Sequence, residues 1–152
     1  MDATERLLAI EDIRQLKARY FRLLDAQDWS AYLSLFALDA VMDMRDVLRD
    51  PLSGEPPRDE LYLVGLAAIE AFVLGGVSGG RTVHLGHMAE IDITSAATAS
   101  AIWVLEDYGR WPQRSSVRRL HGLGHLYDDY ERIDGRWLIK RTRMTRMMVD
   151  TE

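Results

Sequence analysis

Apolar residues recur at steps of three and four along the first part of the chain, which is the spacing that places them on one face of an α-helix. Asp2 is suited to cap the N-terminus of this helix, and Glu5 follows three residues later, near the positive end of the helix dipole. The apolar positions are Leu7, Ile10, Ile13, Leu16, Tyr20 and Leu23 or Leu24. The pattern predicts a helix from about Ala3 to Leu24, directly followed by Asp25.

The next segments combine short helical and strand-like patterns. Residues 29–36 (WSAYLSLF) predict a second, shorter helix that Asp28 can cap. Residues 37–47 (ALDAVMDMRDV) predict a short strand, because apolar and polar positions alternate there. Three of the four prolines lie in residues 50–60, which predicts a loop. Residues 63–76 (LVGLAAIEAFVLGG) predict a helix that its two final glycines close.

From Thr82 onward the chain changes to long segments in which β-branched and aromatic residues are frequent, as is typical of strands. Asp134 and Gly135 form a strong hairpin signal, and strands joined by short turns are antiparallel. The predicted strands are residues 82–94, 97–111, 116–133 and 135–149.

Helices first and strands afterwards are the order of an α+β fold, in which helices pack on one face of an antiparallel sheet. The sequence shows no internal repeat, low-complexity tract or interdomain linker, so residues 1–152 are expected to form one domain. A long, curved sheet with helices across its mouth encloses an apolar cavity, and small molecules bind in such cavities.

The composition narrows the possible partners. A net charge of −5 argues against nucleic acid, whose phosphates require a concentrated positive surface. The chain has no cysteine, which excludes disulfides, thiol catalysis and thiolate metal sites, and a cytoplasmic location is the expectation. The longest apolar stretch, residues 61–77, is interrupted by Glu70 and glycines, so no membrane span is expected, and the N-terminus lacks the pattern of a signal peptide.

The stretch TVHLGHM, residues 82–88, places His84 and His87 in an apolar, strand-like segment. Residues three apart on a regular strand point to opposite faces, so one imidazole is expected inside and the other outside, unless Gly86 introduces a bulge. An interior histidine is either a hydrogen-bonded core residue or the base of a buried pocket.

Asp25 follows the first helix. A carboxylate at the C-terminal end of a helix faces the negative end of the dipole, and partial burial also disfavours its charged form, so it becomes more basic. The alternative is a solvated aspartate in the turn before Trp29.

Other polar side chains give weaker signals. His121 and His125 lie about 13 Å apart if they are on a strand, which is too far for both to bind one metal ion, and no metal site is expected. Glu106 and Tyr108 share one strand face and Trp103 lies on the other, and either face could line a pocket. The basic run near the C-terminus suits a solvated strand face or a subunit contact; it comprises Arg136, Lys140, Arg141, Arg143 and Arg146.

Three segments, residues 10–44, 82–94 and 126–144, resemble the SnoaL-like branch of the nuclear transport factor 2-like superfamily, and the resemblance extends over nearly the whole chain. It implies a cone-shaped, strongly bent sheet wrapped around helices, with a deep pocket between them. Dehydratase and dehydrochlorinase members of this family use an aspartate after the first helix and a histidine at the start of the middle strand, which correspond to Asp25 and His84.

The resemblance implies a cofactor-independent lyase or isomerase that acts on a small, cyclic, hydrophobic molecule. His84, oriented by Asp25, is expected to remove a proton. A polar group is expected to assist the leaving group or the developing oxyanion, and the candidates are Tyr108, Glu106, Arg143 and Arg141. The expected pocket residues are Tyr20, Trp29, Trp103, Glu106, Tyr108 and His125.

The sequence also departs from the family. Leu24 and Met44 stand where the dehydratase has tyrosines, which makes its substrate doubtful here. Two other functions therefore remain open, a non-catalytic small-molecule binding module and the small subunit of a ring-hydroxylating dioxygenase. Relatives commonly form dimers or trimers, and a homo-oligomer is expected, with the Arg-rich final strand and the Met-rich C-terminus near the contact.

Overall fold

The computed structural model describes residues 1–113 and 116–152. Its first element is α1 (Ala3–Ala26), which begins at the predicted capping box: Asp2 accepts from the backbone of Glu5, and the Glu5 side chain accepts from the backbone of Asp2. The helix ends at Gln27, whose left-handed backbone closes the last turn. It is two residues longer than predicted, so Asp25 lies in its last turn.

Two of the short elements that follow have bounds that differ from the predicted ones. Helix α2 (Trp29–Leu33) has the predicted cap, because the Asp28 side chain accepts from the backbone of Ala31, but it ends three residues early. Helix α3 (Leu66–Val77) starts after Gly65 and continues through the glycines that were expected to close it. The remaining elements here are β1 (Phe36–Asp43), the 3-10 turn η1 (Asp59–Leu61) and β2 (Tyr62–Val64), and β2 replaces the first turn of the predicted helix.

Four long strands follow, as predicted: β3 (Arg81–Ile93), β4 (Thr98–Arg110), β5 (Arg119–Ile133) and β6 (Arg136–Thr151). The hairpin between β5 and β6 turns at Asp134 and Gly135, both of which have positive φ angles, as a two-residue primed turn requires.

The sheet has the order β2-β1-β6-β5-β4-β3. The expectation of an antiparallel sheet is confirmed for every pair except β1 and β6, which run parallel. This parallel pair arises because α3 and β3–β5 separate β1 from β6 along the chain, so the connection is a long crossover and not a hairpin.

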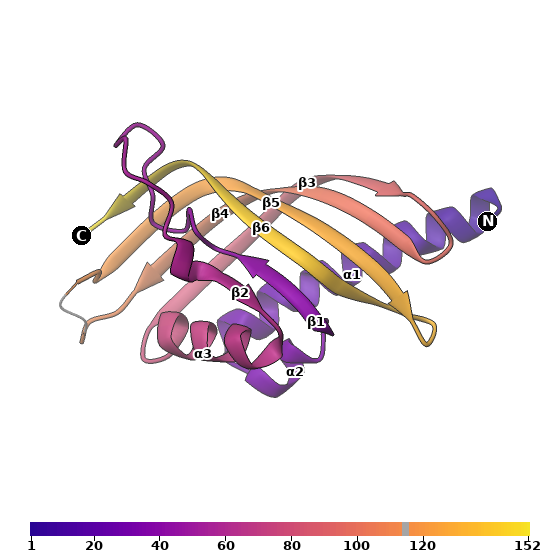
Figure 1. Ribbon diagram of the computed structural model, residues 1–152, viewed down its shortest axis with the longest axis horizontal. Coiled ribbons are helices and arrows are strands. Elements are labelled where there is room, and N and C mark those ends of the chain that lie inside the picture. Colours follow the sequence, from indigo (N-terminus) through magenta and orange to yellow (C-terminus); the bar gives the residue numbers. More distant parts are fainter. Residues whose placement is uncertain (114–115) are drawn as a thin grey trace.

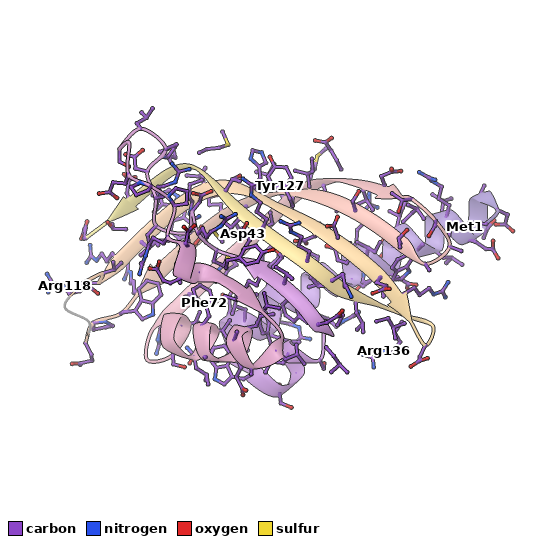
Figure 2. All side chains as sticks on the ribbon, in the orientation of Figure 1. Met1, Asp43, Phe72, Arg118, Tyr127 and Arg136 are labelled. Carbon is purple, nitrogen blue, oxygen red and sulfur yellow. The ribbon has the colours of Figure 1, made fainter. Side chains whose placement is uncertain are left out.

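The sheet curls around the helices, which all cover one of its faces (Figure 1). We call the helix-covered face of the sheet the inner face and the opposite one the outer face. Buried and exposed residues alternate regularly along β4. The residues buried on its inner face are Ala99, Ala101, Trp103, Leu105 and Asp107, and their neighbours are partly or fully exposed. Figure 2 shows the side chains on this ribbon. The buried core includes Ile13, Leu16 and Tyr20 of α1 and inner-face residues of the strands.

A buried polar network joins α1 to the sheet. The Nζ atom of Lys17 lies 2.8 Å from the Asp128 carboxylate, and both side chains are buried. Tyr130 and Thr142 donate to the same carboxylate at 2.6 Å, and Trp103 donates to the Tyr130 hydroxyl. Every polar group of the network is therefore paired, as burial requires. In the described part of the chain, no helix is long and apolar enough to cross a membrane.

Candidate functional site

A cavity of about 440 Å³ lies between the inner face of the sheet and the helices. This volume is within the range of small-molecule sites. Helix α1 contributes Tyr20, Phe21 and Leu24, and α3 contributes residues between Ala71 and Val77. Each of β3, β4, β5 and β6 contributes inward-facing side chains, so the cavity is built by elements from the whole length of the chain.

His84 and Asp25 meet at one wall of the cavity. The Nδ1 atom of His84 lies 2.6 Å from Oδ1 of Asp25, and the His84 backbone N–H donates to Oδ2 at 2.9 Å. The Thr82 hydroxyl donates to Oδ1 at 2.8 Å. Asp25 is thus held by three hydrogen bonds from β3, which fix the last turn of α1 against the start of that strand.

This arrangement selects one tautomer of the imidazole. An ionised carboxylate only accepts hydrogen bonds, so Nδ1 of His84 carries the hydrogen that Asp25 accepts, and Nε2 keeps its lone pair. The Phe21 ring is stacked on the imidazole at 6.3 Å between centroids, with an angle of 12° between the planes. His84 lines the cavity and its side chain is 13% exposed. The imidazole therefore lies in the cavity wall with only a small part of its surface exposed.

A second charged pair, Arg146 and Asp107, lines the cavity opposite the helices. The two Nη atoms of Arg146 donate to the two carboxylate oxygens of Asp107 at 2.5 and 2.9 Å, and Nε donates to the backbone oxygen of Val47 at 2.9 Å. Both side chains are buried. A bidentate pair of this kind has a fixed geometry, which an isolated surface arginine lacks.

The rest of the cavity wall is mainly apolar or aromatic. Tyr20 and Tyr32 pack ring against ring at 5.1 Å, and burial raises the pKa of both phenols above the ordinary range, so both stay neutral. Met42, Met44 and Trp111 also border the cavity. Buried charge at the cavity is therefore concentrated in the Arg146–Asp107 pair and in the Asp25 carboxylate that His84 contacts, as in a site that binds a mainly hydrophobic ligand.

Only some of the predicted pocket residues line the cavity. Tyr20 lines the cavity, and Tyr108 borders it, although its hydroxyl donates to Glu106 on the outer face. Trp103 is on the inner face but is buried beside Tyr130, away from the cavity wall. Trp29 packs on the core from α2 without lining the cavity.

Glu106 and His125 lie on the outer face, because alternate residues of a strand point to opposite sides. Glu106 is the centre of a cluster there: it accepts from Tyr108 at 2.6 Å and from Nε2 of His121 at 2.9 Å, and Nε2 of His87 lies 3.5 Å away. These hydrogen bonds lower the pKa of the Glu106 carboxyl, with the Tyr108 hydroxyl as the largest cause. His84 and His87 thus point to opposite faces, as predicted.

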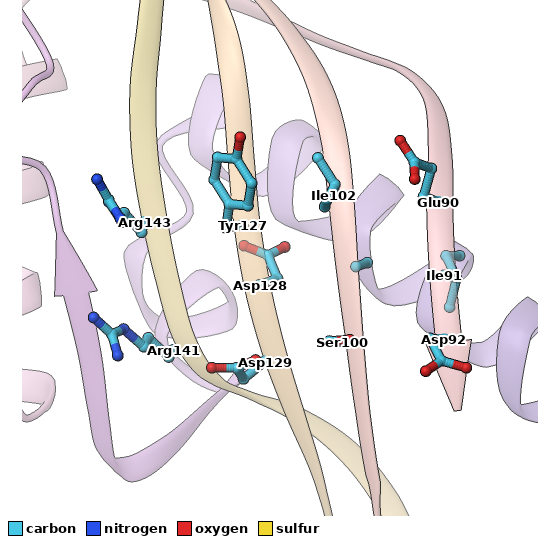
Figure 3. Close-up of a pocket in the computed structure, with 11 residues that line it drawn as sticks. Glu90, Ile91, Asp92, Ser100, Ile102, Tyr127, Asp128, Asp129, Arg141 and Arg143 are labelled. Carbon is cyan, nitrogen blue, oxygen red and sulfur yellow. The ribbon is translucent and has the colours of Figure 1, made fainter. Parts of the chain in front are cut away.

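Arg143 and Arg141 also lie on the outer face, where they border a separate hollow (Figure 3). In this view Arg141 and Arg143 extend from β6 beside Asp129 and Tyr127 of the neighbouring strand. Neither arginine lines the cavity that holds His84. The arginine of β6 that does reach this cavity is Arg146, three residues after Arg143.

A bulge in β6 explains the difference between the predicted and the observed arginine. Tyr130 pairs with Ile139 but Asp129 pairs with Arg141, so Lys140 is an extra residue in the ladder. The inward positions before the bulge are 137 and 139, and those after it are 142, 144 and 146. Strict alternation from residue 137 would instead have placed 141 and 143 inside.

No group of three or more histidine, aspartate or glutamate side chains in the described ranges is arranged to hold a metal ion. The wall of the cavity instead carries two pairs of titratable groups: Asp25 lies behind His84, and Asp107 lies against Arg146. These pairs support proton transfer and hydrogen bonding to a ligand.

Comparison with known proteins shows which fold and which family the chain has. By structure the chain is similar to a scytalone dehydratase-like protein of Novosphingobium aromaticivorans DSM 12444, with a TM-score of 0.80 and 18% identity over 99% of this chain and 92% of the other. It is also similar to hexachlorocyclohexane dehydrochlorinase LinA type 2, with a TM-score of 0.79 and 15% identity over 99% and 93%.

A third structure, an aromatic ring hydroxylase-like protein from Novosphingobium aromaticivorans, gives a TM-score of 0.74 and 23% identity over 94% of both chains. At these identities the three structures establish the fold. The model of the SnoaL-like domain family matches residues 5–143, which is most of the sequence. The chain therefore belongs to the SnoaL-like domain family.

Proposed function

We propose that this protein is a cofactor-independent lyase or isomerase that removes a proton from a small, cyclic, hydrophobic molecule. The observation that carries the proposal is the hydrogen bond of 2.6 Å between Nδ1 of His84 and Asp25, with the imidazole in the wall of a cavity. A base needs an unprotonated nitrogen within reach of the substrate, and this hydrogen bond leaves Nε2 free for that role.

In the proposed reaction, Nε2 of His84 takes a proton from a carbon of the substrate, and the electron pair of that C–H bond moves into the substrate. In a lyase it forms a double bond while a leaving group departs with its own bonding pair. In an isomerase it forms an enolate that is protonated at another carbon. Asp25 stabilises the imidazolium, and partial burial of the pair strengthens their attraction.

The cavity supports the proposed substrate class. Its volume of about 440 Å³ accommodates one or two small rings, and its wall is mainly aromatic and aliphatic. The dehydratase-like and dehydrochlorinase structures named above agree with an elimination reaction. The proposal does not extend to the specific substrate of either protein, because Leu24 and Met44 line this cavity at positions where the family resemblance implies tyrosines.

The test is a turnover screen with cyclic ketones, hydroxylated aromatics and chlorinated cycloalkanes. We expect His84→Gln to lower the rate on any active compound by about 10²- to 10⁴-fold, the usual contribution of a general base. Asp25→Asn is expected to lower it as well, because an amide can donate to Nδ1 and so select the wrong tautomer. The matched control is His87→Gln, whose imidazole is on the outer face.

A non-catalytic binding module is the second candidate, and the loss of the two tyrosine positions favours it. This function predicts that compounds which stabilise the protein against heat bind equally well to the native chain and to His84→Gln, with no turnover by either. Full activity of both His84→Gln and Asp25→Asn on a confirmed substrate would refute the proposed base.

A further inference from the structure

The geometry points to Thr82 as a positioning residue: its hydroxyl group fixes the carboxylate of Asp25, and this carboxylate in turn fixes the imidazole of His84. The effect of Thr82 on turnover rests on the proposed function of His84. Its effect on the orientation of the imidazole stands on its own, because that orientation is measured without a substrate.

The end of α1 is fastened to the start of β3 by two hydrogen bonds that do not involve the Thr82 hydroxyl. The side-chain amide of Gln27, which ends the helix, donates to the backbone oxygen of Gly80 at 2.9 Å. The backbone N–H of His84 donates to Oδ2 of Asp25, also at 2.9 Å. These bonds place Asp25 next to β3, but a single bond to Oδ2 leaves the other carboxylate oxygen free to swing around it.

The Thr82 hydroxyl removes this freedom. It donates to Oδ1 of Asp25 at 2.8 Å, so each carboxylate oxygen is held by a donor that belongs to β3. Nδ1 of His84 then meets Oδ1 at 2.6 Å. A carboxylate oxygen has two lone pairs, so Thr82 and His84 donate to the same atom without displacing each other. The plane of the carboxylate is therefore set independently of the imidazole.

The orientation of the Thr82 hydroxyl is restricted by its surroundings. Threonine is β-branched, so few χ1 angles are accessible to it, and the side chain is only 9% exposed. On β4, Thr82 pairs with Gly109, and a side chain at residue 109 would collide with the Trp111 ring that covers this glycine. The side of Thr82 toward β4 is thus next to an aromatic surface, and Asp25 provides the acceptor.

Asp25 requires such donors because of its position in the helix. It lies in the last turn of α1, where the negative end of the helix dipole disfavours a carboxylate. Its side chain is also 24% exposed, so water can reach it and compete for its oxygens. Hydrogen bonds to a charged acceptor are stronger than those between neutral groups, and the donors from β3 therefore hold the carboxylate in one orientation.

This orientation matters for a base because the lone pair of Nε2 must be aimed at the substrate. A carboxylate that turns away from Nδ1 no longer selects the tautomer of His84, and the tautomer with its hydrogen on Nε2 cannot accept a proton. A misplacement of about 1 Å at a reacting group can lower a rate by about 10²-fold. The Thr82 hydroxyl thus increases the fraction of molecules in which the base is ready to act.

The test replaces Thr82 with valine, which keeps the β-branched shape and lacks only the hydroxyl. The matched control is Thr142→Val, because Thr142 is also buried and donates to an aspartate, Asp128, at 2.6 Å, within the core network of the fold. Both variants lose one hydrogen bond between a threonine and an aspartate, so a loss of stability alone would affect them alike. Thr82→Ser keeps the hydroxyl and is the rescue variant.

Proton and nitrogen-15 NMR of the substrate-free protein measure the orientation of the imidazole. We expect a narrow signal from a hydrogen on Nδ1 of His84 in the native protein, in Thr82→Ser and in Thr142→Val. In Thr82→Val this signal should broaden, and a larger fraction of His84 should carry its hydrogen on Nε2. An unchanged signal in Thr82→Val, or an equal change in Thr142→Val, would overturn the inference.

Turnover of any compound that the native protein converts gives the second measurement. Thr82→Val should lower kcat by about 10- to 100-fold, the range of one hydrogen bond to a charged group. It should leave KM unchanged, because the hydroxyl donates to Asp25 and valine keeps the shape of the cavity wall. Thr82→Ser should recover most of the rate, and Thr142→Val should retain it under conditions where the variant is folded. A native kcat in Thr82→Val would refute the role of Thr82 in catalysis.

The two measurements separate this inference from the proposed function. If Thr82→Val disturbs the His84 signals but His84→Gln does not reduce turnover, the positioning role stands and the proposed base is refuted. If His84→Gln abolishes turnover while Thr82→Val keeps the native signals and the native kcat, the base stands and the role of Thr82 is refuted.

Discussion

The ammonium group of Lys17 lies 2.8 Å from the carboxylate of Asp128 in the centre of the fold, where both side chains are excluded from solvent. Burial lowers the pKa of Lys17, while Asp128 opposes this shift. Removal of one partner leaves the other charge buried without compensation. We predict that Lys17→Met lowers the free energy of unfolding by about 3–5 kcal/mol, measured by urea denaturation.

The double variant Lys17→Met with Asp128→Asn checks the cause. Its loss of stability should be clearly smaller than the sum of the two single losses, because no unpaired charge remains. The amide introduced by Asp128→Asn has one oxygen, which can accept from one of the Tyr130 and Thr142 hydroxyls, and an NH2 group, which can donate to the other. Additive losses would show that the two charges do not interact.

The second prediction concerns acid stability and the Glu106 cluster. Because hydrogen bonds from Tyr108, His121 and His87 lower the folded-state pKa of Glu106, its carboxylate stabilises the fold above the unfolded-state pKa near 4.5. This contribution is lost as the pH falls from 4.5 through the folded-state value. Glu106→Gln should therefore reduce the difference in stability between about pH 7 and about pH 3. If the stability of Glu106→Gln depended on pH as that of the native protein does, Glu106 would not be a source of the acid sensitivity.

The third prediction links packing to the proposed base. A methyl group at residue 86 would collide with the Phe21 ring, which is stacked on the imidazole of His84. Gly86→Ala should destabilise the protein by about 1–3 kcal/mol, as overpacking does, and reduce turnover through displacement of the ring. Addition of Phe21→Leu should restore part of the stability but not the turnover, which circular dichroism and the activity assay measure separately.

The fourth prediction concerns assembly. Several large apolar side chains on the outer face are exposed, among them Leu85, Val104 and Met148. We expect the protein to form a homodimer or homotrimer through this face, and Val104→Lys with Met148→Lys to shift it toward the monomer in sedimentation equilibrium. Leu52→Lys, at an apolar residue in the loop before β2, is the matched control. A native monomer would contradict the expectation.

Much of the fold could be predicted from the sequence because its signals are local. The capping box at Asp2 and Glu5, the cap at Asp28 and the hairpin at Asp134 and Gly135 each involve residues close together in the chain. The parallel pairing of β1 and β6 could not be predicted, since it depends on the packing of the whole sheet. The same applies to β2, whose three residues are too few to show a period.

The site was predicted in part for the same reason. Asp25 and His84 were identified through the family resemblance, and the structure brings them together. Arg146 was missed because one extra residue, Lys140, reverses the alternation of β6, and no local signal in the sequence marks that bulge. Asp107, its partner, was missed because a buried carboxylate is expected only when the opposite charge is known.

Proton removal by His84 depends most on the protonation state of its imidazole. Nitrogen-15 NMR of histidine-labelled protein, with signals assigned through His84→Gln, reports directly which ring nitrogen carries the hydrogen. In the neutral imidazole, we predict a hydrogen on Nδ1, held by Asp25, and a free Nε2 whose signal shifts when a cavity ligand binds. A hydrogen on Nε2, or an Nε2 signal that no cavity ligand affects, would contradict His84 as the base.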